Sequence, residues 1–112
     1  MERKDIYNHN IHRDYIIHPL LGFLIRKLKI KKNNINLLTT NSLGLRDDEI
    51  ENSLNIENVI LGGSVVFGSG ATSDNTTISA YLNKYEKKYF NAGVPGHSLI
   101  QHIILLLSLI HI

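Results

Sequence analysis

The sequence predicts an α/β fold in which parallel strands alternate with helices. The first reason is the order of segments after residue 56, where short apolar runs, Gly-rich loops and stretches of helical periodicity alternate. The second is composition, since 43% hydrophobic and 20% charged residues over 112 positions suit one small globular domain. In such a sheet, the loops that follow the strands converge at the carboxyl edge, where ligands bind.

The first expected strand is Val59-Ile60-Leu61, which ends at Gly62-Gly63. A continuous β-branched and apolar run of this kind indicates a strand that is covered on both faces. The second expected strand is Tyr89-Phe90-Asn91, closed by a turn over residues 93–96.

The first expected helix spans 76–88, with N-cap candidates at residues 74–76. Its apolar face consists of residues at helical spacing, namely Ile78, Leu82, Tyr85 and Tyr89. A second helix begins at Ser98, because Ser98 and Gln101 match a capping box.

Residues 1–55, called the leader below, are polar, rich in Asn, Lys and Ile, and irregular in period. Its basic cluster at 26–32 is interleaved with Leu28 and Ile30, which indicates the solvated face of a strand or turn. With a net charge of only +2, we expect no nucleic-acid partner. We interpret residues 46–49, Arg-Asp-Asp-Glu, as a turn with solvated charges.

Several classes of site and location are disfavoured. The chain has no cysteine, and His9, His12 and His18 lack well-placed carboxylates, so we expect no metal site. No secretory signal is visible behind Met1, which favours a cytoplasmic location. The apolar stretch 103–112 is too short to span a membrane, and we expect it to leave an apolar patch exposed.

Ser64 is the candidate for chemistry. It follows the first strand behind two glycines that let the backbone turn sharply, so its hydroxyl and its N–H can face one small volume. Gly96 could add a second donor N–H from the neighbouring loop. A tight turn without chemistry is the other interpretation, and composition alone favours it. A phosphate-binding loop is disfavoured, because no Lys follows Gly68.

Four separated motifs resemble the SGNH (GDSL-type) ester hydrolases between about residues 15 and 105. Residues 60–64, Ile-Leu-Gly-Gly-Ser, resemble the family's first block, and residues 91–98, Asn-Ala-Gly-Val-Pro-Gly-His-Ser, resemble its second. The upstream segments 18–23 and 40–46 resemble the leader of SGNH proteins from bacterial polysaccharide and surface modification.

The resemblance implies a flavodoxin-like three-layer α/β/α sandwich, of which residues 56–112 would be the N-terminal part. It implies that Ser64 is the nucleophile and that the N–H groups of Ser64 and Gly96 form the oxyanion hole. It gives the supporting loop positions to Gly62, Gly63, Gly68, Asn91 and Gly93. Asn41 and Arg46 would hold the leader against the catalytic domain. The implied partner is a small-molecule ester, such as an acylated carbohydrate, and no cofactor is implied.

Two blocks of the family's pattern do not occur. Neither the G-x-N-D block, which supplies an oxyanion-hole Asn, nor the D-x-x-H block, which supplies the base, follows Gly96. His97, His102 and His111 have no Asp three residues before them, and we interpret His97 as a loop side chain. We therefore expect a truncated domain with negligible esterase activity as this chain alone. A non-catalytic fragment that binds a small ligand or a partner is the alternative.

Overall fold

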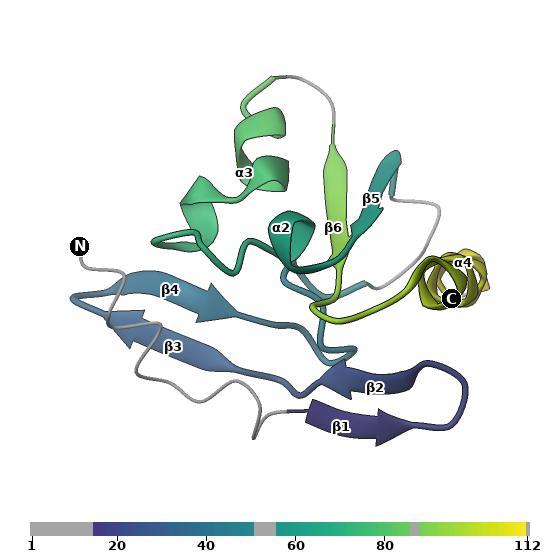
Figure 1. The fold of residues 1–112 in the computed structure, drawn as a ribbon. Coiled ribbons are helices and arrows are strands. Elements are labelled where there is room, and N and C mark those ends of the chain that lie inside the picture. Colours follow the sequence, from purple (N-terminus) through teal and green to yellow (C-terminus); the bar gives the residue numbers. More distant parts are fainter. Residues whose placement is uncertain (1–14, 51–55, 86–87, 112) are drawn as a thin grey trace.

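The computed structural model describes residues 15–50, 56–85 and 88–111, which form three two-stranded sheets (Figure 1). Two are antiparallel hairpins: β1 (Tyr15–His18) pairs with β2 (Gly22–Ile25), and β3 (Lys29–Lys32) pairs with β4 (Ile35–Thr39). The third sheet is parallel and joins β5 (Asn58–Gly62) to β6 (Tyr89–Gly93). The prediction of an α/β chain with parallel strands is confirmed at this level.

In the described residues four helical segments accompany the sheets. They are α2 (Ser64–Phe67), the 3-10 turn η3 (Asp74–Thr76), α3 (Ile78–Leu82) and α4 (Leu99–Ile110). In Figure 1, α3 and α4 lie on opposite sides of the β5–β6 pair. The predicted capping box at the start of α4 is present, and the Ser98 N–H donates to Gln101 Oε1 at 2.7 Å. None of the helices in the described part of the chain is long and apolar enough to cross a membrane.

The two parallel strands differ in burial, and here one expectation is wrong. All five residues of β5 are only half-buried, whereas four of the five residues of β6 are buried. Within the described residues each strand pairs on one side alone, so the difference comes from packing. Phe90 and Ala92 of β6 belong to a buried cluster, whereas Val59 and Leu61 of β5 lie at its margin. The sequence located both strands correctly but overestimated the burial of β5.

The helix predicted over 76–88 is also wrong in length and in orientation. Helix α3 ends at Leu82, and the Asn83 side chain exchanges hydrogen bonds with the backbone N–H and C=O of Tyr89. That exchange ties the end of the helix to the start of β6 and replaces further helical turns. Ile78 and Tyr85 are 43% and 75% exposed, and the buried residue of α3 is Ser79. The N-cap positions are Ser73 for η3 and Thr77 for α3.

The described part of the leader is regular rather than irregular. Its β3–β4 hairpin turns at Asn33 and Asn34, which both have positive φ angles of 52° and 64°. Paired positive φ angles suit a tight hairpin turn, and Asn tolerates them better than most residues. The lysines of β3 are exposed while Leu28 is buried, as expected for the solvated face of a strand. The metal candidates His9 and His12 lie outside the described residues.

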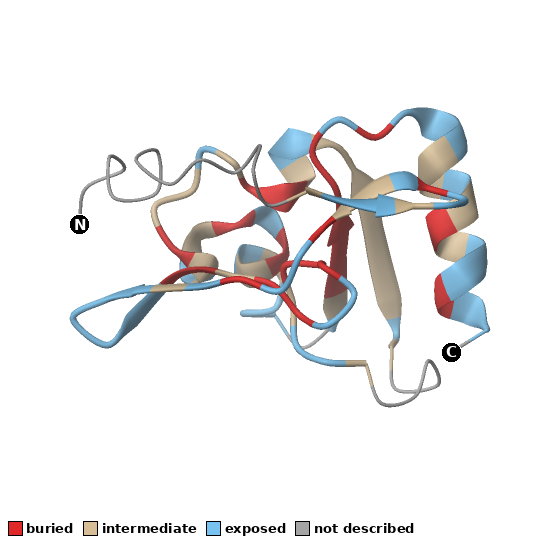
Figure 2. Cartoon of the chain, turned by 90° about the horizontal axis from the view of Figure 1, so that it is seen from below, coloured by how far each residue is buried: buried red, intermediate tan, exposed pale blue. Residues whose placement is uncertain are grey.

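Two buried clusters join the leader to the rest of the chain (Figure 2). The first lies between the β1–β2 hairpin, β6 and α4, and comprises Leu21, Leu45, Phe90, Ala92, Val94, Leu105 and Leu109. The second lies between both hairpins and α2, and comprises Ile25, Leu28, Leu37, Leu38 and Phe67. Residues from before and after position 55 share both clusters, so the leader contributes to the same hydrophobic core as β6 and α4.

Candidate functional site

The two Gly-rich loops leave the parallel sheet at the same edge. In the β5–β6 register Gly62 is the partner of Gly93, and the backbone N–H of Val94 donates to the Gly62 carbonyl at 2.9 Å. Ser64 begins two residues beyond Gly62, and Gly96 lies three residues beyond Gly93. The predicted convergence of the two loops at the carboxyl edge of the strands is confirmed.

Ser64 is the first residue of α2 and is exposed. The first backbone bond of this helix runs from the Phe67 N–H to the Gly63 carbonyl at 3.0 Å. The N–H groups of a helix's first turn have no partner inside the helix, so the Ser64 N–H is not used by α2. The hydroxyl and the N–H of one residue therefore both lie at the start of an exposed turn.

The backbone bends at Gly63, between β5 and α2, as the glycine pair led us to expect, whereas Gly62 and Gly93 serve packing. Neither Gly62 nor Gly63 has a positive φ angle. A Cβ on Gly93 would lie 2.4 Å from the Phe67 backbone nitrogen, and a Cβ on Gly62 would lie 2.4 Å from a methyl of Val66. These two glycines thus allow α2 to pack directly on the β5–β6 pair, whereas a Cβ on Gly63 would meet nothing within 4 Å.

Gly68 and Gly96 are the two loop glycines whose backbone demands glycine. Their φ angles are +90° and +84°, in the left-handed region that L side chains rarely adopt. Gly68 caps the end of α2, and a Cβ there would lie 2.9 Å from Nη1 of Arg46. Gly96 is exposed beside Phe23 of β2, so the leader borders the second loop.

Asn91 is buried in β6 and supports the second loop from below. The side-chain oxygen of Asn91 accepts from the Gly93 N–H at 3.0 Å. The backbone N–H of Asn91 donates to Oδ2 of Asp47 at 2.8 Å. Among the described residues no partner reaches its buried Nδ2. The position therefore links the glycine loop to the leader.

His97 is buried and faces the leader. Its Nε2 lies 2.7 Å from the Phe23 carbonyl, so this nitrogen carries the proton and donates, and the His97 ring meets the Phe23 ring edge-on at 4.9 Å. Burial lowers the pKa of His97 below its usual value, with smaller contributions from nearby His102 and His18. The interpretation of His97 as a loop side chain agrees with this geometry, because the ring hydrogen-bonds to Phe23 of β2 and packs against its ring.

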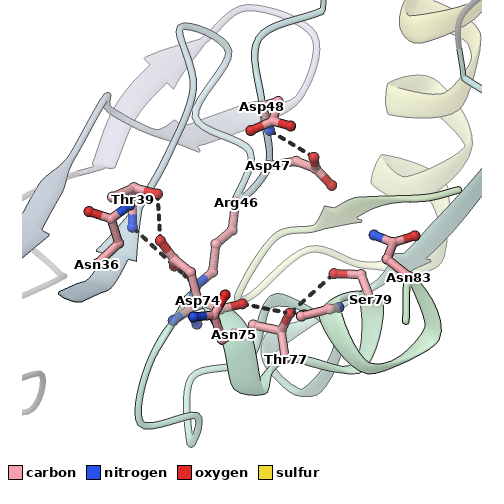
Figure 3. Close-up of a pocket in the computed structure, with 11 residues that line it drawn as sticks. Asn36, Thr39, Arg46, Asp47, Asp48, Asp74, Asn75, Thr77, Ser79 and Asn83 are labelled. Carbon is pink, nitrogen blue, oxygen red and sulfur yellow. Dashed lines mark hydrogen bonds and ion pairs between the residues drawn. The ribbon is translucent and has the colours of Figure 1, made fainter. Parts of the chain in front are cut away.

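A polar cavity of about 320 Å³ lies apart from these loops (Figure 3). Its walls come from β4, the 46–48 turn, η3 and α3. The lining residues are Asn36, Thr39, Arg46, Asp47, Asp48, Asp74, Asn75, Thr77, Ser79, Ala80 and Asn83. None of the predicted catalytic or supporting-loop residues belongs to this set, whereas Arg46, which the resemblance singled out, does.

The guanidinium of Arg46 organises the floor of this cavity. Its Nε pairs with Asp74 Oδ1 at 2.8 Å, and its two terminal nitrogens donate to the carbonyls of Leu37, Phe67 and Gly68. The side chain of Arg46 is 1% exposed, so its interpretation as a solvated turn residue is wrong. The role implied by the resemblance fits better, because Arg46 joins the leader to the segment that carries Ser64.

Asn41 behaves differently from Arg46. Its side chain bonds only within the leader in the described structure, to the N–H groups of Leu43 and Leu45 and to the Asp48 carbonyl. It shapes the turn from which Arg46 projects, and within the described residues none of its side-chain hydrogen bonds reaches the Ser64 segment. Only a motif match flagged these two residues, because composition gives no sign that a charge here is buried.

Asp47 is the half-buried carboxylate of the cavity. Burial raises the pKa of Asp47, although the N–H groups of Asn91 and Asp48 donate to it and oppose that rise. Asp48 and Asp74 raise it slightly further by charge repulsion. The cavity thus combines carboxylates, amides and hydroxyls, a lining suited to a polar ligand.

Comparison with known proteins adds no identity to this geometry. No protein-family model matches the chain, and no curated protein matches it.

Proposed function

We propose that this chain carries the nucleophile part of a serine ester hydrolase or acyl-ester transferase of the SGNH type, with Ser64 as the nucleophile. The observation that carries the proposal is the Gly62–Gly93 register, which brings the Ser64 and Gly96 loops to one edge of a parallel sheet. In the proposed full domain, β5 and β6 are the first two strands of the flavodoxin-like sandwich.

The chemistry follows from what that edge offers. The Ser64 hydroxyl attacks the ester carbonyl, and the backbone N–H groups of Ser64 and Gly96 stabilise the negative charge that forms on the carbonyl oxygen. Glycine at position 96 supports this role, because a side chain there would stand beside the donor N–H. No metal or organic cofactor takes part in this mechanism.

The general base is the part that these residues do not supply. His97 donates from Nε2 to the Phe23 carbonyl, and its burial disfavours the protonated state that a base must reach during attack. An unassisted serine is a poor nucleophile, so we expect negligible turnover from the 112-residue chain. The base and the third oxyanion donor would come from D-x-x-H and G-x-N-D blocks.

The test begins with the coding sequence beyond the codon for Ile112, read in all three frames. If both blocks are encoded, a polypeptide that includes them should hydrolyse 4-nitrophenyl acetate. Ser64→Ala should then reduce kcat by about 10³-fold or more, while Ser108→Ala, on the exposed side of α4, should not. Absence of both blocks, or hydrolysis that survives Ser64→Ala, would contradict the proposal.

The polar cavity supports a second candidate, a fragment that binds a small polar ligand without chemistry. Carboxylates of the cavity would recognise such a ligand, so a screen of small polar metabolites should raise the melting temperature of the chain. Ser64→Ala should leave that shift unchanged, and Asp48→Asn, on the exposed rim, should reduce it. A shift abolished by Ser64→Ala and kept in Asp48→Asn would favour the hydrolase edge instead.

A further inference from the structure

We propose that the outer face of α4 is an interface between two copies of this chain. This face, called the α4 stripe below, consists of five large aliphatic residues: Leu99, Ile100, Ile103, Leu107 and Ile110. Their exposed fractions are 72%, 69%, 49%, 52% and 58%. The proposal concerns a surface remote from Ser64 in sequence and does not depend on the proposed chemistry.

The α4 stripe is continuous. At about 100° per residue, its five positions fall within an arc of about 100° on the helix. The buried residues Leu105 and Leu109 lie on the opposite face, where they pack into the core with Leu21 and Phe90. Figure 2 shows this division, with red segments facing the sheet and blue ones facing away. A helix that is apolar on both faces is normally covered on both.

The size of the stripe suits a contact between proteins. Five aliphatic side chains exposed to this extent offer roughly 500 Å², near the largest patch found on ordinary monomers. The β1–β2 turn, which carries Leu20 at 68% exposure, lies beside the start of α4, because Gln101 Nε2 donates to the Leu21 carbonyl. A standard interface takes about 800 Å² from each partner, so the α4 stripe would form a contact at the small end of the range, and we expect a reversible dimer.

A second copy is the occupant that fits this chemistry. Residues 99–112 contain no Lys, Arg, Asp or Glu, so the stripe has no charge with which to select a partner of opposite charge. For the same reason two copies meet without like-charge repulsion. Residues 99, 103 and 107 follow one i, i+4 ridge of the helix, and two such ridges can pack together about a twofold axis. A helix that lies on a lipid surface instead presents a basic polar face, which α4 lacks.

The first experiment is sedimentation equilibrium of the 112-residue chain between about 1 and 200 µM. We expect the mass to rise with concentration from 12.7 kDa toward twice that value. Ile103→Gln combined with Leu107→Gln should weaken association at least tenfold, and Gln preserves helix propensity. The matched control is Tyr81→Gln with Tyr85→Gln, which changes two exposed residues at and beyond α3 and should dimerise normally. Circular dichroism verifies that each variant keeps its helices.

Cross-linking gives a second measurement that does not require weakened binding. The chain has no cysteine, so Ile103→Cys introduces a single thiol on the stripe, and Tyr85→Cys introduces one elsewhere. A bismaleimide should cross-link the first variant into dimers and the second much less. A monomer at the highest concentration, or dimers that survive the double Gln change, would overturn the proposal. Stripe-dependent pelleting of a monomeric chain with phosphatidylcholine–phosphatidylserine vesicles would also overturn it, in favour of a lipid surface.

Discussion

The two sides of the β5–β6 pair are stabilised by different interactions. On the α3 side, the Arg46 guanidinium is 1% exposed and binds a carboxylate and three backbone carbonyls. On the α4 side, Leu105 and Leu109 pack into the core while the opposite face of the same helix is exposed and aliphatic. One side pairs its buried charge internally, and the other leaves apolar surface uncovered.

This difference distinguishes the side whose interactions are internal to the chain from the side that can bind another molecule. A buried charge must be paired where it lies, and the Arg46 guanidinium finds all of its partners within this chain. Exposed aliphatic surface does not need a partner within the same molecule, but the free energy falls when another apolar surface covers it. The α4 side is therefore where we expect association.

The largest expected effect is at Arg46. Arg46→Ala would leave Asp74 without its cation and remove the donors to three carbonyls, at a cost of about 4 kcal/mol in the free energy of unfolding. Arg46→Lys should cost less, because the ammonium can still pair with Asp74 but cannot reach all the carbonyls. Urea unfolding measures both.

The control for this pair is Lys29→Ala, which alters an exposed strand residue and should change the free energy of unfolding by less than about 0.5 kcal/mol. Equal losses at Arg46 and Lys29 would mean that the Arg46 contacts do not join the leader to the Ser64 segment.

The second prediction compares two leucines on one helix. Leu105 is 3% exposed and Leu107 is 52% exposed. Leu105→Ala should cost about 3 kcal/mol because it opens a cavity in the core, whereas Leu107→Ala should cost well under 1 kcal/mol at low protein concentration. Thermal unfolding at two concentrations tests this and links it to the proposed dimer. The Leu107 effect should grow as concentration rises, since dimerisation stabilises only the folded chain.

The elements that the sequence located correctly are those with local signals. Strand β6 and helix α4 follow from an apolar run and from the Ser98–Gln101 capping box, which depend on neighbouring residues alone. The predicted length of helix α3 was wrong because the hydrogen bonds between the Asn83 side chain and the Tyr89 backbone, six residues away, end the helix early. The burial of β5 was predicted wrongly because it depends on which distant segments pack on each strand, and no local pattern encodes that packing.

The third prediction concerns two glycines near Ser64. Gly68→Ala should cost about 2 kcal/mol, because φ is +90° and the new Cβ would crowd Arg46 and Thr77. Gly63→Ala should be nearly neutral, because φ is not positive and nothing lies within 4 Å of the added Cβ. Chemical denaturation of the two variants gives the comparison. A costly Gly63→Ala would mean that the approach to Ser64 is tighter than this geometry.

The candidate site was predictable only in part, for a related reason. Gly-rich loops after two strands indicate a shared edge, and the β5–β6 register bears this out. The polar cavity could not be found in this way, because Asn36, Asp48 and Asn83 come from three separate segments and carry no common motif. Arg46 illustrates the limit, since a charged residue in a charged run looks solvated until its partners are placed.

The smallest expected effect is a pH dependence at the contact between the second loop and the leader. Burial lowers the pKa of His97 below the 6.5 of the unfolded chain, so the unfolded state binds its proton first as pH falls. Stability from this group is therefore complete above pH 6.5 and is lost as pH falls from 6.5 through the lower folded pKa. The loss cannot exceed about 1.4 kcal/mol per pH unit, since one proton is involved.

Melting temperatures between pH 8 and 5 should fall less steeply in His97→Gln than in the wild type, after the Asp and Glu contribution common to both is subtracted. His102 and His18 also face this ring, so His102→Gln is the matched control and should leave most of the dependence in place. An unchanged slope in His97→Gln would show that the buried imidazole does not couple folding to pH at this contact between the second loop and the leader.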